Sequence, residues 1–105
     1  MTRQRLSDRR PNLTVPFVHE GGAYSTTLGF DVRDHRIAEV FIHGAKVGSG
    51  MDRILDDACV ALSLLLQHGV DPAVLASSMG RLGDGKTPAS IVGALTDLLA
   101  HEAAQ

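Results

Sequence analysis

The clearest pattern of apolar and polar positions lies between Lys46 and Gly69, which reads KVGSGMDRILDDACVALSLLLQHG. Apolar residues recur there every three or four positions, the spacing of one face of a helix. Ser49 is suited to cap such a helix and Gly69 to end it. The pattern predicts a long helix from Ser49 to His68 at the centre of the core, with an apolar face formed by Met51, Ile54, Leu55, Ala58, Leu62, Leu65 and Leu66.

The region before this helix is rich in Val, Phe, Tyr, Thr and Leu, which favour strands. The stretch from Leu13 to Val32 is interrupted by the turn signal Glu20-Gly21-Gly22 and therefore predicts two antiparallel strands. A polar turn at Asp34-His35-Arg36 precedes a third strand, Ile37 to His43. These segments predict a three-stranded antiparallel meander packed on the long helix.

Two further helices are predicted after Gly69. Asp71-Pro72 supplies a cap and a first-turn proline for a short helix that Gly80 would end. Thr87-Pro88 repeats that signal for a last helix, and Arg81 to Lys86 between them reads as a flexible loop. The buried side of the last helix would be Ile91, Val92, Leu95, Leu98 and Leu99. The fold class is therefore predicted to be α+β.

The length of 105 residues suits one compact domain. Residues 1–12 carry Arg3, Arg5, Arg9 and Arg10 with few apolar residues, so they read as a flexible basic tail, either solvated or used as a docking arm. Residues 13–105 would form the single domain. With 44% hydrophobic and 21% charged residues, the composition is that of an ordinary globular protein.

Charge and composition exclude several classes of protein. A net charge of -2 argues against a strong nonspecific nucleic-acid binder, and the short helix from Asp71 to Gly80 has no Lys or Arg with which to read DNA. No segment is long and apolar enough to suggest membrane insertion or secretion. Cys59 is alone, which excludes an intramolecular disulfide and a cysteine cluster. We therefore expect a cytoplasmic protein with no nucleic-acid or membrane partner.

The candidate binding residues are Lys46, Gly48, Ser49 and Gly50, where a cation and two glycines adjoin the free N–H groups of a helix start. They predict either an anion or nucleotide site or simply a tight, well-capped connection, and they lack the full P-loop pattern. The five histidines are scattered without helical i, i+4 spacing, so no metal site is expected. Cys59 reads as a core thiol, no catalytic residues are predicted, and no cofactor is implied.

Several segments together resemble the TSCPD domain family. The resemblance spans roughly Arg5 to Leu99, in the family's own order, and is carried by Leu6-Ser7-Asp8-Arg9-Arg10, the Tyr24 to Gly29 strand, Glu39-Val40-Phe41-Ile42, Lys46 with Gly48-Ser49, Ala61-Leu62-Ser63-Leu64 and Gln67-His68-Gly69-Val70. That domain is found at the carboxyl end of adenosylcobalamin-dependent ribonucleotide reductases and as small free-standing proteins. The cysteine signature of the family is missing, and the matching region reads Gly85-Lys86-Thr87-Pro88-Ala89-Ser90-Ile91. A metal or redox role of those cysteines cannot be carried over.

The resemblance implies a free-standing accessory or binding domain associated with ribonucleotide reductase and deoxyribonucleotide metabolism, with the large chain of the reductase as partner. It implies no catalysis by the chain alone, because that reaction needs a radical-bearing cysteine and a reducing cysteine pair in a large barrel. Two alternatives stay open. One is a small protein that binds a phosphate or nucleotide at Lys46 to Gly50. The other is a homodimeric interaction module, suggested by the wide apolar stripe of the long helix and by the two edges of the sheet.

Overall fold

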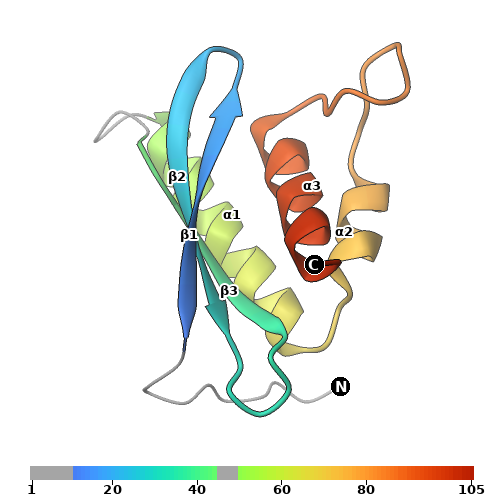
Figure 1. Cartoon of the computed structure of the whole chain (residues 1–105). Coiled ribbons are helices and arrows are strands. Elements are labelled where there is room, and N and C mark those ends of the chain that lie inside the picture. The colour runs from blue at the N-terminus through green and yellow to red at the C-terminus, as the bar shows by residue number, and fades with distance from the viewer. Residues whose placement is uncertain (1–10, 45–49) are drawn as a thin grey trace. The chain divides into compact units, whose positions relative to one another are not determined.

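The structure is a computed structural model that describes residues 11–44 and 50–105. The described residues form three strands followed by three helices (Figure 1). The chain divides into two compact units, Met1–Gly69 and Val70–Gln105, and each is described by itself. A sheet followed by helices confirms the predicted α+β class.

The first unit contains an antiparallel sheet in the order β1-β2-β3, as the meander prediction required. Its strands are β1 (Asn12–His19), β2 (Gly22–Phe30) and β3 (Ile37–His43). Glu20 and Gly21 join β1 to β2, both with positive φ (48° and 77°), which matches the right-handed twist of the two strands. The predicted turn signal therefore lies where the chain reverses.

The two faces of the sheet differ because side chains alternate along each strand. One face carries the buried residues Phe17, Thr26, Leu28, Val40 and Ile42. The opposite face carries Val18, Thr27 and Phe41, of which Val18 is 70% and Phe41 44% exposed. The core of this unit therefore lies on the first face.

Helix α1 (Gly50–Gln67) packs chiefly against β3. It ends as predicted: Gly69 has a φ of 88°, a left-handed conformation that glycine adopts without strain. The predicted apolar face is wrong in part. Met51, Ile54 and Leu65 are exposed, and the buried residues are Leu55, Cys59, Leu62, Ser63, Leu66 and Gln67. The buried stripe is rotated toward two polar residues because these meet the backbone of β3.

The second unit is a pair of packed helices, α2 (Pro72–Ser78) and α3 (Ile91–Ala103). The predicted start of α2 is confirmed, since the Asp71 carboxylate accepts a hydrogen bond of 2.9 Å from the Ala73 N–H. The predicted start of α3 is wrong. Its cap is Ser90, whose hydroxyl accepts from the Gly93 N–H at 3.0 Å. Pro88 instead forms an isolated antiparallel bridge with Arg81.

The segment between α2 and α3 was predicted to be a flexible loop, and the structure shows a hydrogen-bonded turn. The Asp84 carboxylate accepts from the backbone N–H groups of Lys86 and Thr87, each at 2.8 Å, and from the Thr87 hydroxyl. The Leu82 N–H donates to the Thr87 carbonyl at 2.9 Å, which closes the turn. The prediction of a flexible loop is therefore wrong for this segment.

Candidate functional site

The predicted anion loop lies almost wholly outside the described residues, which do not include Lys46, Gly48 and Ser49. Gly50 is described: it is the first residue of α1 and is exposed. A Cβ added at Gly50 would meet no atom within 4 Å, so packing does not require glycine there. The anion site therefore stays a prediction.

The most regular arrangement of polar groups among the described residues joins α1 to the outer edge of β3. The Ser63 hydroxyl accepts from the Val40 N–H at 3.0 Å and is within 3.3 Å of the Val40 carbonyl, to which it can donate. The Gln67 amide donates to the Ala38 carbonyl at 3.0 Å. One turn earlier, the Cys59 sulfur faces the backbone of Ile42. We call Cys59, Ser63 and Gln67 the edge ladder.

The edge ladder has a simple geometric cause. Four residues of a helix rise about 6 Å and two residues of a strand about 6.6 Å, so side chains at i, i+4 and i+8 keep pace with every second strand residue. Val40 and Ala38 are positions where the edge strand turns its N–H and C=O groups away from β2, toward α1. The helix thus occupies the edge where a fourth strand would otherwise pair.

The edge ladder contains no reactive group. Burial of the Cys59 side chain, which is 3% exposed, raises the pKa of its thiol to about 11, against a smaller lowering by the backbone hydrogen bond from Ile42. A neutral thiol is a weak nucleophile. The prediction that Cys59 is a core thiol is confirmed, and the ladder is a structural feature.

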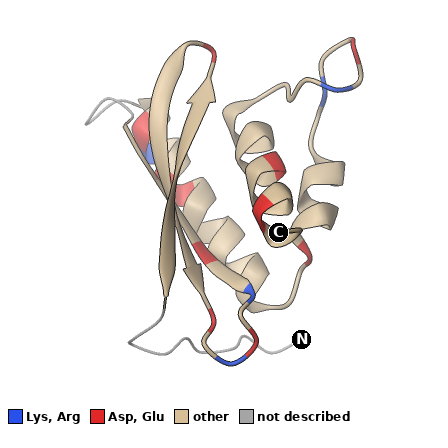
Figure 2. Ribbon diagram, in the orientation of Figure 1, with Lys and Arg blue, Asp and Glu red and all other residues tan. Residues whose placement is uncertain are grey.

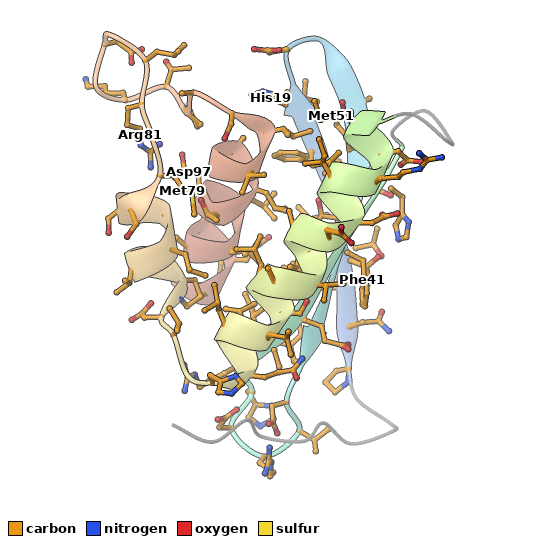
Figure 3. All side chains as sticks on the ribbon, turned by 180° about the vertical axis from the view of Figure 1, so that it is seen from behind. His19, Phe41, Met51, Met79, Arg81 and Asp97 are labelled. Carbon is orange, nitrogen blue, oxygen red and sulfur yellow. The ribbon has the colours of Figure 1, made fainter. Side chains whose placement is uncertain are left out.

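Two close ion pairs fix turns rather than form a reaction centre. The Arg33 guanidinium and backbone N–H both donate to Asp31, at 2.9 Å each, and the side-chain bond lowers the Asp31 pKa to about 2. In the second unit Arg81 and Asp97 point toward each other, with two bonds of 2.6 and 2.7 Å (Figure 3). Arg81 also donates to the carbonyls of Ala76 and Lys86. All of its described bonds hold the turn and the two helices of this unit in place.

A row of apolar residues follows the exposed side of α1. This row lies about 120° around the helix from the buried stripe and consists of Met51, Ile54, Ala58, Ala61 and Leu65. Ile54 is 61%, Met51 53% and Leu65 41% exposed. The acidic residues Asp52, Asp56 and Asp57 are confined to the first half of the same helix. We call these five residues the apolar row of α1.

The described residues hold no group of three or more His, Cys, Asp or Glu side chains that could bind a metal ion. No helix in the same part of the chain is long and apolar enough to cross a membrane.

Sequence reasoning missed two of these features. The edge ladder has a signal, because Cys59, Ser63 and Gln67 are polar or weakly polar residues spaced four apart beside the apolar stripe. That signal is readable only when the neighbouring strand is known to be an edge. Arg81 has no such signal, since its partner Asp97 lies sixteen positions away in another element.

The class of this protein is α+β, with a three-stranded meander whose edge is closed by the long helix α1. A family model for the TSCPD domain matches residues 2–103. The chain therefore belongs to the TSCPD domain family. No curated protein and no solved structure matches it.

Proposed function

We propose that this chain is an accessory domain of ribonucleotide reductase that binds the large chain of that enzyme. The family match over residues 2–103 carries the proposal, because TSCPD domains resemble the carboxyl-terminal domain of adenosylcobalamin-dependent reductases. Cys59, the only cysteine among the described residues, is buried and its thiol pKa is raised, so this thiol is a weak nucleophile.

The apolar row of α1 is the surface we assign to this contact. Scattered exposed apolar residues are common, but residues that follow one side of a helix over four turns offer a continuous surface to a partner. The row contains no charged side chain, and of the acidic residues in the first half of the helix only Asp57 borders it, because Asp52 and Asp56 lie on the other side of the helix. A complementary surface on the reductase would therefore be apolar.

The test is titration calorimetry of the purified reductase large chain from the same host with this chain. We expect saturable binding that Ile54→Asp weakens at least about tenfold, because a charge would be placed in the centre of the contact. The matched control is Val74→Asp on α2, since Val74 is 55% exposed and Ile54 is 61% exposed. The control should bind like the wild type.

Two outcomes contradict parts of the proposal separately. No heat with the reductase at about 100 µM of both proteins would reject the accessory role. Binding that Ile54→Asp and Val74→Asp leave equally unchanged would keep the role and reject the apolar row as its surface. Circular dichroism of both variants confirms beforehand that they are folded.

A further inference from the structure

The sheet has two edges, β1 and β3, and only the edge of β3 is covered by α1. The edge of β3 is closed by the edge ladder of α1, with hydrogen bonds at Val40 and Ala38. The edge of β1 is the other end of the strand order. Helix α1 therefore covers the edge of β3 and leaves the edge of β1 uncovered.

The register fixes which backbone groups β1 turns outward. The Phe30 N–H donates to the Pro11 carbonyl at 3.0 Å. Because the backbone groups of an antiparallel strand alternate in direction, the odd-numbered residues of β1 bond to β2 and the backbone groups of the even-numbered residues point away from it. The Val40 N–H, which points away from β2, gives the same assignment when the alternation is traced from β3 through β2 to β1. Asn12, Thr14 and Val18 thus present outward N–H groups, and Pro16 presents only its carbonyl.

The edge of β1 lacks the charged residues that usually protect an exposed strand. The strand reads NLTVPFVH, without Asp, Glu, Lys or Arg, and Figure 2 shows no charged residue along it. Apolar side chains are exposed beside the outward-facing backbone groups: Val18 is 70% and Leu13 44% exposed. Pro16 opposes pairing at this edge because it has no N–H to donate.

We propose that β1 is an interface at which two copies of this chain pair, antiparallel about a two-fold axis near Val15. This register places Asn12 opposite Val18 of the second copy and Thr14 opposite Pro16 of the second copy. Every outward N–H of the strand then finds a carbonyl, and the missing N–H of Pro16 leaves only the Thr14 carbonyl unpaired. No like charges meet, and the two sheets become one continuous sheet.

The register also accounts for the side chains. Leu13 comes opposite Phe17 of the second copy, and Val15 opposite its own counterpart, on the face of the sheet that carries the core. The exposed part of Leu13 is then covered. This interface is independent of the proposed contact with a reductase, which uses α1.

The test combines sedimentation velocity with amide exchange measured by nuclear magnetic resonance. We expect a dimer at micromolar concentration that Thr14→Pro weakens at least about tenfold, because the central outward N–H is lost from both strands. Thr14→Val keeps the N–H and is the matched control, with a dissociation constant within about twofold of the wild type. Neither substitution touches an N–H that bonds to β2.

Amide exchange keeps the test decisive if Thr14→Pro does not fold. In the wild type, exchange at Asn12, Thr14 and Val18 should slow as the protein concentration rises, whereas exchange at Val15 should be slow throughout. A protein that stays monomeric up to about 1 mM would overturn the proposal. So would a dimer in which exchange at Thr14 and Val18 does not depend on concentration.

Discussion

At the residue scale, the most informative single atom is the hydroxyl oxygen of Thr26. Thr26 lies within β2 on the core face, is 0% exposed, and its Oγ1 has no hydrogen-bond partner among the described residues. A buried hydroxyl without a partner costs about 1–3 kcal/mol. Valine has nearly the same shape and no hydroxyl.

We therefore predict that Thr26→Val raises the free energy of unfolding by about 1 kcal/mol or more. Urea denaturation measures it, with Thr27→Val as control because Thr27 is half-buried on the opposite face. A loss of stability in Thr26→Val would mean that a buried water satisfies the hydroxyl.

Asp84 is the second residue with a measurable consequence. The Thr87 hydroxyl first, and then the backbone N–H groups of Lys86 and Thr87, lower its pKa from 3.8 to about 2. Because the folded-state pKa lies below the unfolded one, the carboxylate stabilises the fold above about pH 4. That contribution is lost as the pH falls toward about 2.

Asp84→Ala should therefore be less stable than the wild type at pH 7, and the difference should shrink between pH 4 and about pH 2. Urea denaturation at several pH values measures it. Thr87→Val removes only the side-chain donor, so its stability should lie between that of Asp84→Ala and that of the wild type. A difference that stays constant down to about pH 2 would show that Asp84 acts without its charge.

At the element scale, the sequence predicts what depends on local signals. The three strands, the turn at Glu20-Gly21 and the end of α1 at Gly69 follow from residue types within a few positions of each other. The start of α3 does not, because Thr87-Pro88 and Ser90 are both acceptable caps. The choice falls to Ser90 since Asp84 and Arg81 hold Thr87 and Pro88 in the turn.

The buried face of α1 was predicted only in part for a related reason. Periodicity locates an apolar stripe, but α1 is apolar over more than one side, and only the position of β3 decides which side is buried. The apolar row of α1 could not be predicted for the same reason, because it depends on which side of the helix stays uncovered. Such information lies in the packing and not in the spacing of residues.

Leucine substitutions on α1 test the corrected face. Leu62 is 4% and Leu65 41% exposed, although both belong to the predicted apolar face. Leu62→Ala should cost about 2–5 kcal/mol because it leaves a cavity, and Leu65→Ala less than about 1 kcal/mol. Chemical denaturation measures both, and equal losses would place the two residues on the same buried face.

The edge ladder makes its own prediction. Ser63→Ala leaves the N–H and carbonyl of Val40 buried without their partner, so we expect a loss of about 1–3 kcal/mol. Ser77→Ala is the control, since the Ser77 hydroxyl is exposed and bonds within its own helix. Amide exchange at Val40 should quicken in Ser63→Ala alone. An unchanged rate there would mean that the bond to Ser63 does not protect the strand edge.

At the scale of the whole molecule, the chain divides into two units at Gly69 and Val70, and the family match runs across that division over residues 2–103. The prediction of one domain over residues 13–105 stays a prediction. The second unit has two short helices and the ion pair of Arg81 with Asp97. Segments shorter than about 40 residues rarely fold alone without disulfides or metals.

We therefore predict that the whole chain unfolds in one cooperative transition. Native-state amide exchange in increasing urea measures this residue by residue, at Leu28 for the first unit and Leu95 for the second, since both side chains are 0% exposed. A single domain requires the two amides to share one free energy of opening and one dependence on urea. If Leu95 opens at a lower free energy while Leu28 stays protected, Val70–Gln105 is an independent, weaker unit. The variant Asp97→Asn, which changes only the second unit, is an independent test. In a single domain both amides open only when the whole chain unfolds, so this variant should lower the opening free energy at Leu28 as much as at Leu95.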